Sequence, residues 1–245
     1  MEFIDWQIRD GIGQLTLRRA PLNVIHIPMM RELLTALQTA DVRALLLRAE
    51  GTLRVFSAGV DVADHTADKV GEMIPLFDSV CAALADFPAP TLAMVQGHAL
   101  GGGCELALSC DLIVAAESAN FGQPEIKLAT IAPIAALRLP ALIGYRRAAE
   151  MLFLGEVMSA TEAARVGLIN RAVPLAELES TVEQYLNKLR GLSGAALRVC
   201  KRALCHTADL SAMETLYLDD LMSTTDAHEG LAAFIEKRVA VWKHQ

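Results

Sequence analysis

The residues that point most directly to chemistry stand in one short stretch. Three consecutive glycines, Gly101 to Gly103, precede a stretch with helical character that carries a single glutamate, Glu105, among apolar neighbours. Glycines between a strand and a helix allow close approach of a ligand and expose N–H groups at the positive end of the helix dipole. Such groups suit an anion, including the oxyanion that develops on a carbonyl. Phosphate binding is disfavoured because neither the dinucleotide nor the phosphate-loop motif is present. Close packing of strand and helix would alone explain the glycines.

A second carboxylate strengthens the chemical interpretation. An ionised Glu105 would be poorly solvated between Cys104 and Leu106, which is costly unless the charge is paired or used. Its place in the first helical turn, where the dipole favours acids, is an equally good explanation for this residue alone. Glu125 follows twenty positions later, in a loop or turn after a short strand. A helix–strand–loop connection can return it to Glu105, so that the two carboxylates share a pocket, hold one water and transfer protons.

A third segment, residues 56–65, is another glycine loop directly after a buried strand. If it faces the triple glycine, the N–H groups of Val60 and Gly102 converge on one carbonyl oxygen. Loss of one such donor typically costs ~3 to 4 kcal/mol of transition-state stabilisation. Ser57 and His65 offer a nucleophile and a base as a weaker alternative, because no third residue is evident to orient them.

Composition limits the partners of this chain. Its 245 residues are 53% hydrophobic and carry a net charge of −7 without runs of Lys or Arg, which disfavours nucleic acid and anionic membranes. The five cysteines lack metal or disulfide spacing, and the N-terminus lacks a secretory signal. We therefore expect a cytoplasmic globular protein that acts on a small molecule and does not span a membrane.

The elements that must position these residues follow from hydrophobic periodicity. Buried strands that alternate with helices predict an α/β fold with a partly parallel sheet. The expected order is a hairpin over 3–19, a helix over 28–40, a strand over 42–50, a loop over 51–65, a helix over about 68–86, a strand over 91–97, a helix over 104–110 and a strand over 111–117.

From about residue 140 onward the pattern predicts only helices. Ser159 and Glu162 have the spacing of a capping box, and glycines 155, 167 and 191 fall where helices should end. We expect a core over 1–190 that contains the active site and a helical appendage over 191–245.

Three segments resemble the enoyl-CoA hydratase/isomerase (crotonase) superfamily: "FSAGVDV", "GHALGGGCELALSCDLIVAAESANFGQPEIKL" and "EGLAAFIEKR". The resemblance covers nearly the whole chain. It implies a crotonase-like spiral of repeated strand–strand–helix units, with C-terminal helices that assemble a homotrimer or a dimer of trimers. It also implies a coenzyme A thioester substrate, with no metal and no cofactor beyond the coenzyme A of the substrate.

The resemblance assigns roles to particular residues. Members that add water to conjugated thioesters use two glutamates, here Glu105 and Glu125, whereas double-bond isomerases usually keep only the second. The oxyanion hole falls on the N–H groups of Val60 and Gly102. The residues implied in binding coenzyme A and substrate are Leu22, Ala58, Asp61, Val62 and Gly101, with Phe234 and Lys237 reaching the nucleotide of a neighbouring subunit.

Two departures narrow the function. The segment "ATIAPIAALRLP" replaces the glycine-rich turn of simple hydratases, and with "FSAGVDVADH" it most resembles the cyclohexa-1,5-diene-1-carbonyl-CoA hydratases. Ala63 stands where a lysine often follows the loop, which leaves the phosphates of coenzyme A to Arg19 or another subunit. We therefore predict a hydratase of such a dienoyl-CoA. Alternatives are an isomerase, decarboxylase or hydrolase of another acyl-CoA or acyl-carrier thioester, a nucleotide-dependent oxidoreductase and a non-catalytic oligomeric or RNA-binding relative.

Overall fold

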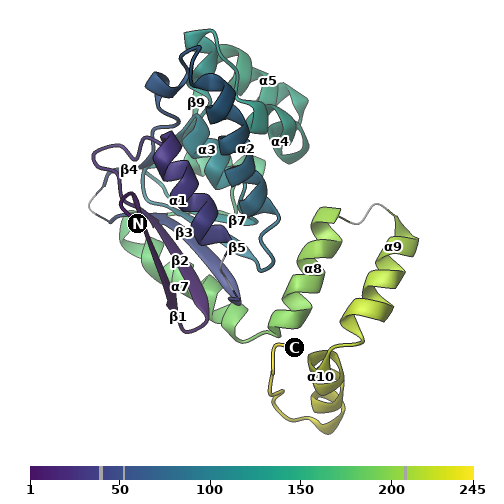
Figure 1. Ribbon diagram of the computed structural model, residues 1–245. Helices are drawn as coiled ribbons and strands as arrows, with labels where there is room; N and C mark the ends of the chain where they lie inside the picture. Colours follow the sequence, from purple (N-terminus) through teal and green to yellow (C-terminus); the bar gives the residue numbers. More distant parts are fainter. Residues whose placement is uncertain (39–40, 52, 207–208) are drawn as a thin grey trace.

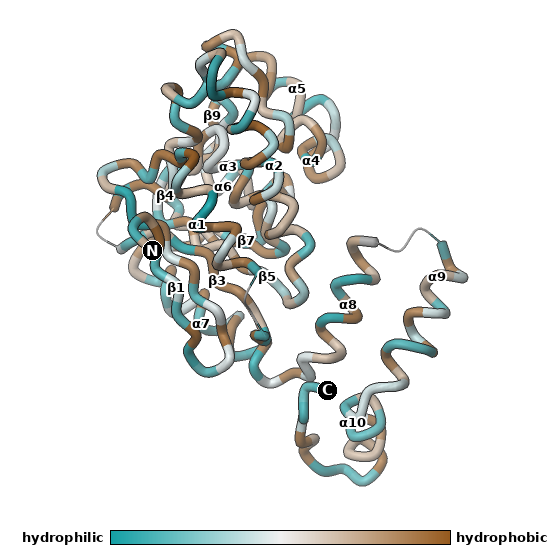
Figure 2. Tube along the Cα trace, viewed as in Figure 1, coloured by the Kyte–Doolittle hydropathy of each residue, from teal (hydrophilic) through white to brown (hydrophobic). Residues whose placement is uncertain are grey.

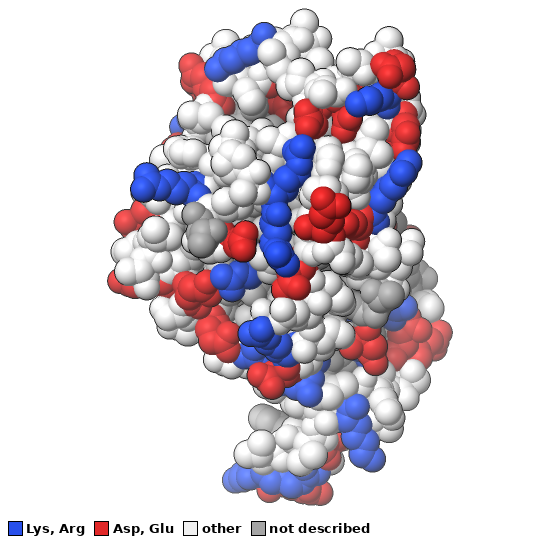
Figure 3. Space-filling view, turned by 60° about the vertical axis from the view of Figure 1, so that its left-hand side comes forward, with Lys and Arg blue, Asp and Glu red and all other residues white. Residues whose placement is uncertain are grey.

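The computed structural model describes residues 1–38, 41–51, 53–206 and 209–245. Figure 1 shows an α/β core from which the C-terminal helices extend to one side. Lys and Arg side chains are interspersed with Asp and Glu over the face drawn in Figure 3. Within the described residues, no helix has both the length and the apolar content that crossing a bilayer requires.

The larger sheet has six strands in the order β1-β2-β3-β5-β7-β10. The first two form the predicted antiparallel hairpin, and the remaining neighbours are parallel. All five residues of β5 are buried, as expected for a strand covered on both faces. The strands are β1 (Ile4–Arg9), β2 (Ile12–Leu17), β3 (Ala44–Ala49), β5 (Thr91–Val95), β7 (Leu112–Ala116) and β10 (Arg171–Val173).

Side chains that alternate along β3 divide the core between the two faces of this sheet. Leu45 and Leu47 pack in the cluster beneath α1, α2 and α3, whereas Leu46 packs with Leu178 and Val182 of α7 on the opposite face. Apolar residues dominate β3 in Figure 2. The helices are α1 (Ile27–Leu37), α2 (Val70–Ala85), α3 (Gly102–Leu108) and α7 (Leu175–Arg190).

A second sheet holds four strands in the order β4-β6-β8-β9. Each has only three residues, too few to show periodicity: β4 (Val55–Ser57), β6 (His98–Leu100), β8 (Asn120–Gly122) and β9 (Val157–Ser159). The order β3-β4-α2 and then β5-β6-α3 repeats the strand–strand–helix unit, so the predicted spiral fold is confirmed.

Two predictions about these elements are wrong. The segment 51–65 was expected to be a loop but contains β4 and the 3-10 turn η1 (Val62–Asp64), and the all-helical region after residue 140 contains β9 and β10. Ser159 does cap α6, since its Oγ accepts the Glu162 N–H at 3.2 Å. The other helices of the core are α4 (Pro133–Ile143), α5 (Tyr145–Leu154) and α6 (Ala160–Val166).

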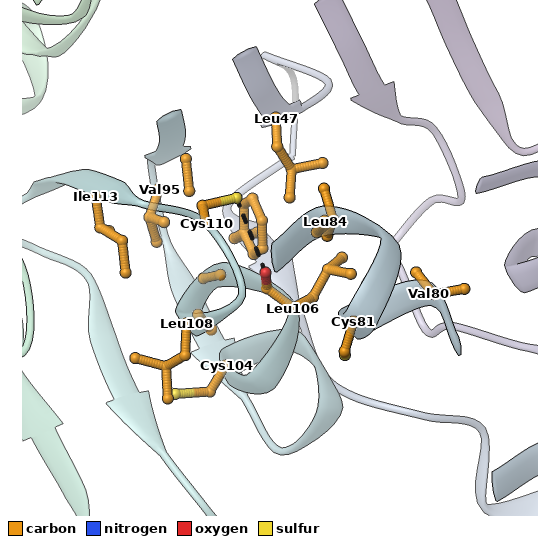
Figure 4. Packing of buried hydrophobic residues seen from close by; sticks show 14 of the residues in the cluster. Leu47, Val80, Cys81, Leu84, Val95, Cys104, Leu106, Leu108, Cys110 and Ile113 are labelled. Atoms are coloured by element: carbon orange, nitrogen blue, oxygen red, sulfur yellow. Dashed lines mark hydrogen bonds between the residues drawn. The ribbon is translucent and has the colours of Figure 1, made fainter. Parts of the chain in front are cut away.

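Helix α3 is packed deep in the core. Figure 4 shows Leu106 and Leu108 among Leu47, Leu84 and Val95, which belong to strands and a helix on either side. All seven residues of α3 are buried. Because close-packed surroundings resist displacement, the N-terminus of this helix is a rigid platform.

The C-terminal arm comprises α8 (Gly194–His206), α9 (Leu210–Thr215), the π-helical turn η3 (Leu216–Leu221) and α10 (Thr225–Glu236). Its buried contacts with the core include an ion pair between Lys201 Nζ and Asp111 Oδ2 at 2.7 Å and a hydrogen bond from Lys201 Nζ to the Ala89 carbonyl oxygen at 3.3 Å. Several of its large apolar side chains are exposed, including Leu204, Leu218, Phe234 and Ile235.

Candidate active site

A pocket of about 640 Å³ lies where four segments of the chain meet. They are the loop after β4, helix α2, the junction of β6 with α3, and the segment from the 3-10 turn η2 (Pro124–Leu128) to the start of α4. Seven of the predicted site residues line this pocket: Ala58, Val60, Val62, Gly101, Gly102, Glu105 and Glu125.

Gly101 and Gly103, at the N-terminal end of α3, are needed for different structural reasons. Gly101 has a φ of +52°, and a Cβ there would lie 2.3 Å from Glu125 Oε1, so its bare backbone lets that carboxylate approach. A Cβ on Gly103 would lie 2.5 Å from the Ser57 carbonyl oxygen, which reflects close packing of α3 against β4. Both interpretations of the triple glycine therefore apply, at different positions.

Two backbone N–H groups border the pocket without an acceptor in the described chain. Ile25 forms backbone hydrogen bonds with the residues before and after Val60. Its N–H donates to the Gly59 carbonyl oxygen at 2.8 Å, and its carbonyl oxygen accepts the Asp61 N–H at 2.9 Å. The Val60 N–H therefore points away from Ile25. Gly102 is the first residue of α3, so its N–H has no acceptor within the helix. The groups are neighbours, since a Cβ on Gly102 would lie 3.3 Å from the Val60 nitrogen.

Glu105 is held at the inner wall of the pocket. It is 3% exposed, and its Oε1 accepts the Ala135 N–H at 3.0 Å. Burial raises the pKa of Glu105 to about 7, the charge of Glu125 adds to this effect, and the N–H groups of Ala135 and Ile134 oppose it. Near neutral pH the side chain is therefore able both to accept and to donate a proton.

Glu125 stands in the first turn of η2. Burial raises the pKa of its carboxyl group, against the opposing influence of the His65 charge. Its Oε2 is buried without a hydrogen-bond partner in the described part of the chain. Thr130 fixes the turn, because its N–H and its Oγ1 both donate to the Glu125 carbonyl oxygen at 3.1 Å. An unpartnered buried oxygen of this kind indicates a position for water or ligand.

The alternative of a Ser57–His65 pair is not supported by the geometry. Ser57 is buried, and its Oγ donates to the Asn23 carbonyl oxygen at 2.7 Å. His65 instead places Nδ1 3.0 Å from the Asp61 carbonyl oxygen. The hydroxyl and the imidazole are thus each engaged with backbone, and no hydrogen bond joins these two described residues.

Four predicted binding residues lie outside the pocket lining. The Leu22 carbonyl accepts the Ala58 N–H at 2.9 Å, and Asp61 lies 3.5 Å from the Arg19 guanidinium as an ion pair. Phe234 is 84% exposed, and Lys237 follows the last residue of α10. The predicted contacts of these residues with coenzyme A stay predictions.

Sequence reasoning missed one wall of the pocket, to which helix α2 supplies Met73, Ile74, Phe77 and Asp78. The segment after Glu125, already singled out from the sequence, supplies Lys127, Leu128, Thr130, Ile131 and Pro133. The helical spacing of the α2 residues was visible, but an amphipathic pattern does not distinguish a face that packs in the core from one that lines a cavity.

Comparison with known proteins decides the family. The enoyl-CoA hydratase/isomerase family model matches residues 7–245. The chain belongs to this family. A cyclohexa-1,5-dienecarbonyl-CoA hydratase of Thauera aromatica is 36% identical over 98% of this chain and 96% of that protein. A probable enoyl-CoA hydratase of Mycobacterium bovis is 34% identical over 96% and 95%.

Solved structures of family members agree with the fold. The crystal structure of an enoyl-CoA hydratase from Bacillus anthracis superimposes with a TM-score of 0.93, at 30% identity over 99% of this chain and 100% of that one. The predicted resemblance, the crotonase-like fold and the class of enzyme, an enoyl-CoA hydratase-type hydro-lyase, are thereby confirmed.

The burial of Glu105 predicts an effect on stability. The Glu105 carboxyl group has a pKa near 4.5 in the unfolded chain and about 7 in the folded protein. Its ionisation therefore destabilises the folded protein progressively as the pH rises from 4.5 to 7, and by the full amount above pH 7. At about 1.4 kcal/mol per pKa unit, Glu105→Gln is expected to raise the free energy of unfolding above pH 7 by up to about 3 kcal/mol. Urea unfolding at pH 8 and near pH 4.5 measures this, and the gain should vanish at the lower pH. A Gln variant less stable than the wild type at pH 8 would contradict the burial argument.

Proposed function

We propose that this enzyme adds water to a conjugated enoyl- or dienoyl-CoA thioester, and that cyclohexa-1,5-diene-1-carbonyl-CoA is its preferred substrate. The observation that carries the proposal is that Glu105 and Glu125 line one pocket beside two N–H groups that have no acceptor among the residues the structure describes. The similarity to the Thauera aromatica hydratase and the apolar wall of Ile74, Phe77 and Ile131 support a hydrocarbon acyl group.

In the proposed mechanism the thioester carbonyl oxygen accepts hydrogen bonds from the N–H groups of Val60 and Gly102. These donors stabilise the negative charge that develops when the β-carbon is attacked. Glu105 removes a proton from water as its oxygen bonds to the β-carbon, and Glu125, which shares that water, gives a proton to the α-carbon when the substrate is a simple enoyl thioester. The proton held by Glu105 then passes to Glu125. One water is consumed, and both carboxyl groups end each turnover as they began.

The acyl-CoA enters as the whole reactant, so the mechanism uses no further cofactor and no metal. Ala58 and Val62 stand at the edge of the pocket where the pantetheine would pass. We further propose a homotrimer or a dimer of trimers, because the apolar side chains exposed on the C-terminal arm would be buried against another copy.

Substrate assays test the reaction class. Purified protein should lower the absorbance of the conjugated thioester with both crotonyl-CoA and the cyclic dienoyl-CoA, with higher kcat/KM for the cyclic substrate. The product should carry one added water and retain coenzyme A. Release of free coenzyme A, or a product of unchanged mass, would instead identify a hydrolase or an isomerase.

A further inference from the structure

A third carboxylate lines the pocket. Asp78, on α2, lies beside Phe77 and one turn after Ile74, and it is partly buried. It forms no hydrogen bond or ion pair with any other residue that the structure describes, whereas Glu72 on the same helix pairs with Arg31. A partly desolvated acid on an apolar wall is unfavourable unless a ligand or water engages it.

Asp78 shares one pocket with both glutamates. Its neighbour Phe77 would lie 3.1 Å from a Cβ on Gly102, so this part of α2 borders the N-terminus of α3, where Gly102 and Glu105 stand. The charge of Asp78 acts on Glu105 together with that of Glu125. Among the described residues, no three His, Cys, Asp or Glu side chains are placed to hold one metal ion.

The chemistry of a diene requires a proton at a second carbon. Attack of water on the β-carbon of a simple enoyl thioester leaves an enolate, which needs a proton at the adjacent α-carbon. With a second conjugated double bond, the negative charge extends to a carbon further from the thioester, and protonation there leaves the remaining double bond conjugated with the carbonyl. Asp78, a further carboxyl group in the pocket of Glu105 and Glu125, suits that remote carbon.

We propose that Asp78 is the acid–base residue that protonates the remote carbon of a conjugated dienolate, so that water adds in a 1,4 sense. This inference rests on the proposed hydration. The water oxygen bonds to the β-carbon, and the released proton passes from Glu105 to Asp78. The electron pair of the dienolate then takes this proton from Asp78 as the new C–H bond forms. Asp78 begins and ends the turnover ionised, and the sum is diene plus water giving the hydroxy-enoyl thioester.

The experiment compares two substrates in Asp78→Asn. For the cyclic dienoyl-CoA, kcat/KM should fall at least ~10²-fold, while for crotonyl-CoA, which needs no remote proton, it should stay within about threefold of the wild type. Asp78→Glu, which keeps an acid, should recover part of the diene activity. Ser79→Ala, at the exposed neighbouring position on α2, is the matched control and should change neither substrate. In D₂O the wild-type product should carry deuterium at the remote carbon.

The outcomes separate this assignment from the proposed function. Equal losses on both substrates, no loss on the diene, or deuterium at the α-carbon of the wild-type product would overturn the role of Asp78 while leaving hydration intact. A wild-type enzyme that hydrates crotonyl-CoA but not the diene overturns it as well. A wild-type enzyme that hydrates neither substrate refutes the proposed function itself.

Discussion

Replacing Glu125 by Gln is expected to lower kcat for crotonyl-CoA hydration by roughly 10²–10⁴-fold, with a much smaller change in KM. The amide keeps the size of the side chain but does not accept a proton at neutral pH. Because Glu125 Oε2 is buried without a partner in the described chain, the loss falls on proton transfer and water binding rather than on the fold.

Steady-state kinetics with crotonyl-CoA, together with the melting temperature, measure this effect. Glu156→Gln is a matched control, because it removes an exposed carboxylate outside the pocket and should leave kcat unchanged. Turnover by Glu125→Gln at the wild-type rate would defeat the mechanism with two carboxylates.

Gly102→Ala is expected to reduce kcat by about 10²–10³-fold, comparable with loss of one donor from an oxyanion hole. The added Cβ would lie 2.6 Å from Val60 Cγ2, 3.1 Å from Phe77 Cζ and 3.3 Å from the Val60 nitrogen. Relief of these contacts requires the side chains of Val60 and Phe77 to shift, and the close approach to the Val60 nitrogen is expected to push the Val60 loop away from α3 and so separate the two N–H groups.

Gly71→Ala provides the control for this variant. It also places alanine in a helix, but no atom lies within 4 Å of the new Cβ. Its activity should therefore match that of the wild type. Its melting temperature should be unchanged or slightly higher, because replacing a glycine within a helix by alanine usually stabilises the helix. Equal kinetics for the two variants would show that the Val60 and Gly102 groups do not act on the carbonyl.

The sequence was sufficient for those elements whose periodicity is long enough to read. The six-residue run of β3 and the buried run of β5 indicated a parallel sheet, and the amphipathic α1 and α2 were found close to their observed bounds. The strands of the second sheet were not predicted, because three residues are too few to show alternation and the pairing of these strands depends on partners distant in sequence.

The same distinction applies to the site. Glu105 was conspicuous as a carboxylate among apolar residues, and Glu125 as an acid in a loop after a strand. Asp78 was not conspicuous, because an acid on an amphipathic helix usually faces solvent. Only tertiary packing decides that the face of α2 carrying Phe77 and Asp78 turns toward the pocket.

A crystal structure of the enzyme with a bound, unreactive acyl-CoA thioester tests the central claim most directly. The account predicts the thioester oxygen within about 3.2 Å of the Val60 and Gly102 nitrogens, and a water held between Glu105 and Glu125 next to the β-carbon. A thioester oxygen bound away from both N–H groups, or an acyl chain that leaves the two carboxylates in separate compartments, would contradict it.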